Sequence, residues 1–130
     1  MITGKNYIGE NLSSNSSVTF QTFNPKLNIE NDIIFYEASD SEIQKSVELA
    51  FDAFKKYKLV SSIEKSKFLN QIADELKLIS DDIVNIYCSE TGLAEVRCLA
   101  ELTRTINQLR SFSELLINGA VSYTHLRAHE

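Results

Sequence analysis

The sequence predicts an α/β fold in which short β-strands precede a series of α-helices. Three observations support this prediction. The first 37 residues contain short β-branched and aromatic segments, separated by stretches rich in Ser and Asn. Later residues carry apolar side chains at steps of three and four, the period of a helix with one apolar face. Ser-x-x-Glu spacings, which are typical of helix N-termini, precede two of these periodic segments.

The composition excludes several classes of protein. The 130 residues suffice for one domain with a modest core, and 43% of them are hydrophobic. The net charge is -5 without a Lys/Arg block, which argues against a nucleic-acid partner. No apolar run approaches the roughly 20 residues of a membrane span, and the first six residues lack the apolar core of a signal peptide. We therefore expect a cytoplasmic protein without a membrane partner.

Three strands are predicted in the extended N-terminal region. They are Asn6 to Ile8, Val18 to Phe23 and Ile33 to Tyr36. Residues 10–17 are rich in Ser and Asn and predict a loop. Asn24-Pro25 ends the second strand, because Pro has no N–H group for the ladder. A hairpin made from such short strands needs another element to pack on.

The first helix is predicted to begin near Ser39 and to end near Lys58. Ser39 to Glu42 has the spacing of a capping box, and Lys55 to Lys58 places positive charge where the helix dipole favours it. The apolar positions recur along one face and are expected to pack in a core: Ile43, Val47, Ala50, Phe51 and Phe54.

Three further helices follow. Ser61 to Glu64 repeats the capping pattern, Ser80 is expected to cap a third helix, and Gly92 suits the left-handed position after that helix. A long helix runs from Ala94 to Ile117, where Asn118-Gly119 stops it. The apolar faces, also expected to be core, consist of Phe68, Leu69, Ile72, Ala73, Leu76 and Ile79; of Ile83, Val84, Ile86 and Tyr87; and of Val96, Leu99, Ile106, Leu109, Phe112 and Leu116.

Four sequence segments, taken together and in this order, indicate a family more specifically than any one of them alone. They are Thr19-Phe20-Gln21-Thr22-Phe23-Asn24-Pro25, the helix Glu42 to Phe54 ending in Ala53-Phe54, Phe68-Leu69-x-x-Ile72-Ala73, and Ser89-Glu90-Thr91-Gly92-Leu93. Together they resemble the N-terminal region of the aldehyde dehydrogenase superfamily. One segment departs from the pattern: the family usually has a small Thr-Gly turn after the Asn-Pro pair, and this chain reads Lys26 to Glu30 there.

Two other pieces resemble one branch of that superfamily. They are Gly4-Lys5-Asn6-Tyr7-Ile8-Gly9 and Glu101-Leu102-x-Arg104-Thr105-x-x-Gln108-Leu109-Arg110-x-Phe112. The branch oxidises 2,5-dioxovalerate (α-ketoglutaric semialdehyde) and related aldehydes. The resemblance implies NAD or NADP as the cofactor of the parent enzyme, a small-molecule aldehyde as its substrate and a homo-oligomeric parent.

The resemblance also implies a two-step oxidation. In the family a Cys thiolate attacks the aldehyde, hydride passes to NAD(P)⁺, and a Glu-activated water hydrolyses the thioester. The family's dinucleotide turn, general-base Glu and nucleophilic Cys all lie far downstream of residue 119. Residues 1–119 are therefore expected to be the N-terminal portion of the dinucleotide-binding domain. Their helices would flank a Rossmann-like sheet that these residues do not include.

We accordingly predict no catalytic, cofactor-binding or metal-binding residue in this chain, which is expected to be inactive alone. Cys88 and Cys98 lie ten residues apart, do not form a zinc or disulfide pattern, and do not match the context of the family's nucleophile. Glu90 and Glu101 fall within predicted helices and are interpreted as structural.

The last ten residues, Val121 to Glu130, resemble a translated sequencing adapter, so residues 120–130 are predicted to be a non-native tail. The alternative for this segment is a metal site formed by His125 and His129 at helical spacing. For the whole chain, the alternative to a dehydrogenase fragment is a stand-alone helical protein-interaction module.

Overall fold

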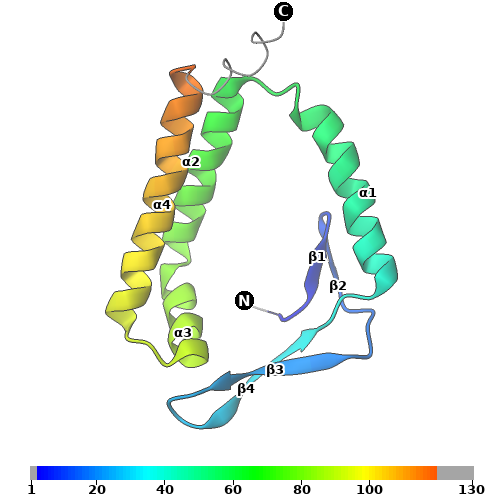
Figure 1. Cartoon of the computed structure of the whole chain (residues 1–130), viewed down its shortest axis with the longest axis vertical. Helices are drawn as coiled ribbons and strands as arrows, with labels where there is room; N and C mark the ends of the chain where they lie inside the picture. Colours follow the sequence, from blue (N-terminus) through cyan, green and yellow to red (C-terminus); the bar gives the residue numbers. More distant parts are fainter. Residues whose placement is uncertain (1–2, 120–130) are drawn as a thin grey trace, which may run out of the picture. The chain divides into compact units, whose positions relative to one another are not determined.

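The computed structural model describes residues 3–119 and confirms a mixed α/β fold. Two antiparallel hairpins precede four helices, in the order β1–β2–β3–β4–α1–α2–α3–α4 (Figure 1). The described residues form two compact units. The first contains residues 3–59 with 89–92, and the second contains residues 60–88 with 93–119.

The first hairpin joins β1 (Asn6–Ile8) to β2 (Asn11–Ser13), with Tyr7 opposite Leu12. β1 has the bounds that the sequence predicts. The prediction of a loop at residues 10–17 is wrong for β2, because this segment lacks apolar alternation and is held extended by its pairing with β1.

The second hairpin joins β3 (Thr19–Asn24) to β4 (Ile29–Tyr36). β4 begins four residues before the predicted start at residue 33, because its polar first half hides the strand pattern. The register shifts after Gln21, whose Nε2 donates to the carbonyl of Asn31 at 2.7 Å. The Asn31 Nδ2 group donates in turn to Thr22 Oγ1 at 3.0 Å, so side chains bridge the irregularity.

The turn between β3 and β4 is built without glycine. The Asn24 side-chain oxygen accepts the backbone N–H groups of Lys26 and Leu27, each at 3.1 Å. The Asn28 N–H group donates to the Asn24 carbonyl at 2.9 Å, and Asn28 adopts a φ of 57°, which asparagine tolerates better than most residues. Where the family usually has a small Thr-Gly turn, this chain therefore has a turn held by two asparagines.

Gly4 allows the chain before β1 to pass close to β4. It has a φ of +64°, and a Cβ atom there would lie 2.0 Å from the Ile34 carbonyl oxygen. Its carbonyl accepts the Tyr36 N–H group at 3.1 Å, and Asn6 Nδ2 donates to the Tyr36 carbonyl at 3.1 Å. A side chain at position 4 would break this junction between the two hairpins.

Both predicted capping boxes are present. The Ser39 hydroxyl accepts the Glu42 N–H group at the start of α1 (Asp40–Tyr57), and the Glu42 carboxylate accepts the Ser39 N–H group at 2.8 Å. The same exchange between Ser61 and Glu64 begins α2 (Ser62–Leu78).

The last two helices end as the sequence predicts. α3 (Ser80–Thr91) is followed by Gly92 at a φ of +68°, and α4 (Glu95–Ile117) is followed by Asn118. The prediction that Ser80 precedes α3 as its cap is wrong. Ser80 is the first helical residue, and the Ile79 carbonyl accepts the first helical N–H group, that of Ile83, at 3.1 Å.

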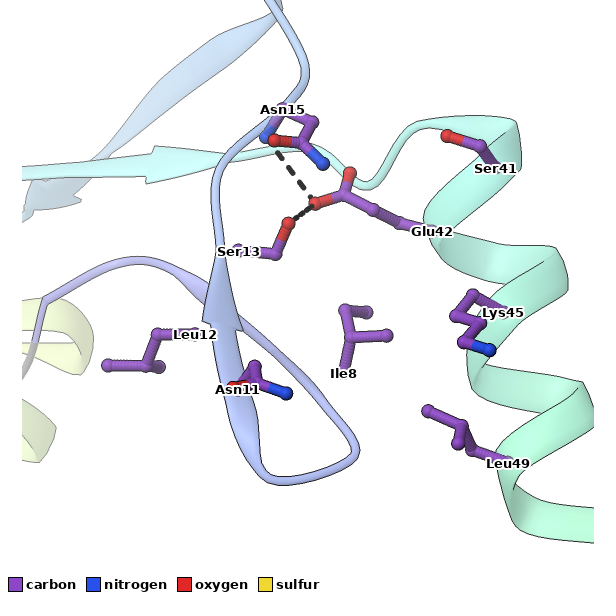
Figure 2. A pocket seen from close by; sticks show the side chains of 9 residues that line it. All are labelled: Ile8, Asn11, Leu12, Ser13, Asn15, Ser41, Glu42, Lys45 and Leu49. Atoms are coloured by element: carbon purple, nitrogen blue, oxygen red, sulfur yellow. Dashed lines mark hydrogen bonds between the residues drawn. The ribbon is translucent and has the colours of Figure 1, made fainter. Parts of the chain in front are cut away.

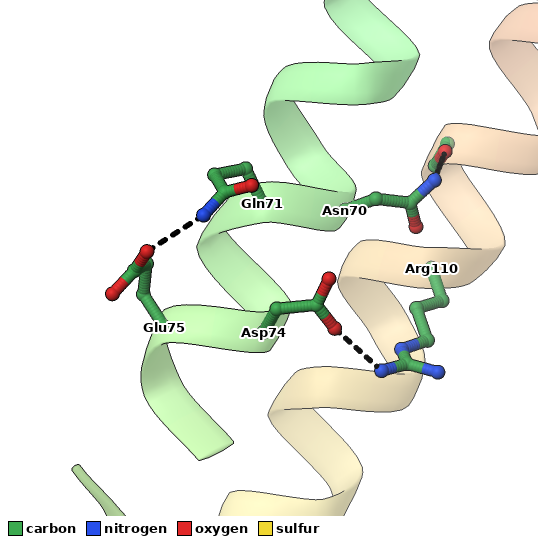
Figure 3. A network of polar contacts seen from close by, with 6 residues as sticks. Asn70, Gln71, Asp74, Glu75 and Arg110 are labelled. Carbon is green, nitrogen blue, oxygen red and sulfur yellow. Dashed lines mark hydrogen bonds and ion pairs between the residues drawn. The ribbon is translucent and has the colours of Figure 1, made fainter. Parts of the chain in front are cut away.

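The seam between α2 and α4 contains small and polar side chains. The hydroxyls of Ser66 and Ser113 are buried and lie 2.6 Å apart, and Ser113 also donates to the Ser66 carbonyl at 3.1 Å. Asn70 Nδ2 donates to the Ser113 hydroxyl at 2.8 Å. Toward solvent, Arg110 pairs with Asp74 at 3.0 Å (Figure 3). Such small side chains let the two helices approach closely.

Only three apolar side chains are buried among the described residues: Ala73, Val84 and Cys98. The expectation that the helical faces form core is wrong for α1, whose Val47 and Phe51 are 60% and 62% exposed. It is also wrong for Phe68, Val96 and Phe112, each at least half exposed. The periodicity identified apolar faces correctly, but residues 3–119 do not supply the surface to cover them. No helix of the described residues is long and apolar enough to cross a membrane.

Removing the Ser113 hydroxyl should weaken the α2–α4 seam. Ser113→Ala removes the hydroxyl that both Ser66 and Asn70 contact in this buried seam. The free energy of unfolding should fall by about 1–3 kcal/mol. The measurement is the urea concentration at which helical circular dichroism is half lost. Ser111→Ala, at an exposed position of the same helix, is the matched control and should leave the midpoint unchanged. Equal midpoints for the two variants would contradict this account.

The uncovered face of α1 should bind a hydrophobic dye and promote self-association of residues 1–119. Val47→Gln with Phe51→Gln should lower dye fluorescence and aggregation without loss of helical signal, because both side chains are exposed. Gln44→Ala with Glu48→Ala is the control, because it shortens two exposed polar side chains and removes only the hydrogen bond between them. A monodisperse monomer that melts in one sharp cooperative transition would refute this prediction.

Candidate functional site

One cavity of the first unit lies between the β1–β2 hairpin and the start of α1 (Figure 2). It is open and has a volume of about 420 Å³. Its lining combines apolar, amide, hydroxyl and charged side chains: Ile8, Asn11, Leu12, Ser13, Asn15, Ser41, Glu42, Lys45 and Leu49. The only carboxylate in this lining is Glu42, so the chemistry of the cavity depends on what that group is free to do.

The Glu42 carboxylate is fully engaged. One oxygen accepts the Ser13 hydroxyl and, at 3.4 Å, the Asn15 N–H group. The other oxygen accepts the Ser39 N–H group and the Ser39 hydroxyl, each at 2.8 Å. One side chain therefore closes the helix cap and holds the end of β2 and the residues after it against α1. Sequence spacing found the cap but not this second role, because Ser13 and Asn15 lie almost thirty residues away.

These hydrogen bonds make Glu42 a weak base near neutral pH. The Ser13 hydroxyl, followed by the Ser39 N–H group and hydroxyl, lowers the pKa of Glu42 from 4.5 to about 2. A useful general base has a pKa close to the working pH, and its oxygens must be able to reach a substrate proton. In this cavity the Glu42 carboxylate therefore acts as a structural link between α1 and the end of the β1–β2 hairpin.

The two cysteines do not form an activated pair. Cys98 is buried in α4, and burial, followed by electrostatic repulsion from Cys88 and Glu95, raises the pKa of its thiol. A thiol held protonated is a poor nucleophile. Cys88 is half-buried in α3.

The two glutamates interpreted as structural lie in helices, as expected. Glu90 is in the last turn of α3, and Glu101 in α4 pairs with Arg97 at 2.6 Å. Within residues 3–119 there is no group of three or more His, Cys, Asp or Glu side chains that could hold a metal ion. The alternative site at His125 and His129 lies outside the described residues.

The pKa of Glu42 predicts a specific acid sensitivity. The folded value of about 2 lies below the ordinary 4.5, so its contribution to stability is complete above pH 4.5 and is lost as the pH falls toward 2. Carboxyl chemical shifts measured by NMR across this range should give a midpoint near 2. Glu42→Gln should remove this step, whereas Glu48→Gln on the same helix should keep it. A Glu42 midpoint near 4.5 would refute the described network.

The model of the aldehyde dehydrogenase family matches residues 12–126. α-Ketoglutaric semialdehyde dehydrogenase 2 of Azospirillum brasilense is 32% identical over 119 residues, which cover 91% of this chain and 23% of that enzyme. The α-ketoglutaric semialdehyde dehydrogenase of Acinetobacter baylyi is 30% identical over 117 residues, which cover 89% of this chain and 22% of that enzyme.

The fold is shared with a solved structure. The crystal structure of a NAD-dependent benzaldehyde dehydrogenase from Corynebacterium glutamicum matches 98% of this chain and 28% of its own, with a TM-score of 0.83 and 20% identity. The chain thus spans less than a quarter of the length of the two curated relatives. The family match includes residues 121–126, part of the segment that resembles an adapter, and the origin of that segment stays a prediction.

The relatives confirm the resemblance to the superfamily and to its α-ketoglutaric semialdehyde branch. Because the family model matches most of the residues and the strands and helices follow the fold of a solved aldehyde dehydrogenase, this chain belongs to the aldehyde dehydrogenase family.

Proposed function

We propose that this chain is the N-terminal part of an NAD(P)-dependent aldehyde dehydrogenase that oxidises α-ketoglutaric semialdehyde to the corresponding carboxylate. The observation that carries this proposal is the family match over residues 12–126, together with two relatives whose names state that substrate. The choice between NAD and NADP stays open. The parent is proposed to be a cytoplasmic homo-oligomer.

In this proposal the described residues have a structural role in the parent enzyme and take no part in its chemical steps. The Glu42 carboxylate is occupied by four hydrogen bonds, and the Cys98 thiol is buried with a raised pKa. We therefore propose that the nucleophile, the general base and the dinucleotide turn belong to the part of the parent outside residues 1–119. The 130-residue chain alone is proposed to be inactive.

The exposed apolar faces support the same proposal. α1 carries its apolar residues along one face, and these stay at least half exposed: Ile43, Val47, Phe51 and Phe54. Covering one such side chain stabilises a protein by about 1.5–3 kcal/mol. A sheet of the parent's dinucleotide-binding domain would provide this cover, with these helices flanking it.

A chimaeric enzyme tests the proposal. Residues 1–117 of this chain replace the matching segment of the Azospirillum brasilense enzyme, and NAD(P)H absorbance reports oxidation of α-ketoglutaric semialdehyde. The chimaera should be active, because the family contacts are preserved, whereas the host enzyme without this segment and the 130-residue chain alone should be inactive.

Two results would contradict the proposal. Reduction of NAD(P)⁺ by the 130-residue chain alone would show that the chain is catalytically complete. A source locus that encodes Val121 to Glu130 and then stops would favour the stand-alone interaction module. A locus that continues after Gly119 into a Gly-rich turn and a downstream Cys would support the dehydrogenase.

A further inference from the structure

A second hollow lies on α4, in the unit that contains α2. It has a volume of about 280 Å³, just below the usual range for small-molecule sites. One helix supplies its whole lining, at positions that helical periodicity brings to one face: Arg104, Asn107, Gln108, Ser111, Phe112 and Leu115. Ser113, which is buried, belongs to the seam with α2, so α4 uses a different face for the hollow.

The arginines of α4 differ in their partners. Arg97 pairs with Glu101 at 2.6 Å, and Arg110 pairs with Asp74 at 3.0 Å. Arg104 makes no hydrogen bond or ion pair within residues 3–119 and lies in the hollow. Among the arginines of this helix, Arg104 is therefore the one whose guanidinium group can bind a carboxylate without giving up an existing partner.

The remaining lining suits a short chain with an acid at one end. Asn107 and Gln108 carry amide donors beside Arg104, and Ser111 adds a hydroxyl. Phe112 and Leu115 provide apolar surface, 50% and 39% exposed, against which methylene groups can lie. α-Ketoglutaric semialdehyde has this pattern, because a carboxylate and a keto group at one end are joined through methylenes to the aldehyde.

We infer that the hollow on α4 binds the carboxylate end of the substrate, with Arg104 as its anchor. This inference rests on the proposed function. A guanidinium group holds a carboxylate through two parallel hydrogen bonds, which selects for acids over neutral aldehydes of the same length. Because the carboxylate lies at the opposite end from the reacting aldehyde, Arg104 is a specificity-determining residue and takes no part in the chemical steps.

The test uses the full-length parent enzyme and two substrates, α-ketoglutaric semialdehyde and pentanal. Arg104→Met should lower kcat/KM for the acidic aldehyde by about 10- to 100-fold, mainly through KM, and should leave pentanal almost unchanged. Arg104→Lys should restore part of the loss. Methionine and lysine have helix propensities close to that of arginine, so α4 should keep its structure.

Arg97→Met is the matched control, because Arg97 lies on the same helix, outside the hollow and already paired with Glu101. It should leave the ratio of the two kcat/KM values unchanged. An Arg104→Met enzyme that keeps its preference for the acidic aldehyde would overturn the inference, and so would equal losses on both aldehydes. An unsubstituted parent that oxidises no aldehyde would refute the proposed function itself, and the assignment of Arg104 with it.

Discussion

Scarce apolar cover is the constraint on which the structure of residues 3–119 depends, so polar contacts at helix ends and along one helix seam are prominent in it. Three buried apolar side chains cannot offset the conformational entropy of more than a hundred ordered residues. The helices instead begin at reciprocal Ser–Glu caps, and α2 and α4 join through the Ser66–Ser113 pair. Every buried side-chain nitrogen and oxygen in the described part of the chain has a partner, so the polar contacts are complete even though the apolar ones are not.

Glu42 shows how a side chain used for structural hydrogen bonds changes its acid–base behaviour. Its carboxylate stabilises the first turn of α1 and, through Ser13 and Asn15, ties a strand far away in the sequence to that helix. The hydrogen bonds that make it a good structural link also lower its pKa and occupy its oxygens. A carboxylate used in this way accepts a further proton only in strong acid, so its hydrogen bonds persist across the neutral pH range.

The sequence predicted the helices well because their signals are local. Ser39 with Glu42, and Gly92 after α3, specify helix ends within a few residues of chain, and both are present as predicted. The strands were harder, since β2 and the first half of β4 are polar and become strands only through their partners. Burial was the least predictable property, because periodicity shows that Phe51 belongs to an apolar face but not whether a covering surface exists within the same chain.

The candidate site residues were also predictable only in part from local sequence. The motif that contains Arg104 and Gln108 pointed to a family branch, but spacing alone assigned no role to either residue. Contacts distinguish Arg104 from Arg97 and Arg110, since the structure gives the other two arginines carboxylate partners and places Arg104 in a hollow without one. α4 thus has two polar faces with different consequences. Toward α2 the polar groups satisfy one another and fix the packing, whereas on the other face Arg104 keeps its hydrogen-bonding capacity for a group that residues 3–119 do not supply.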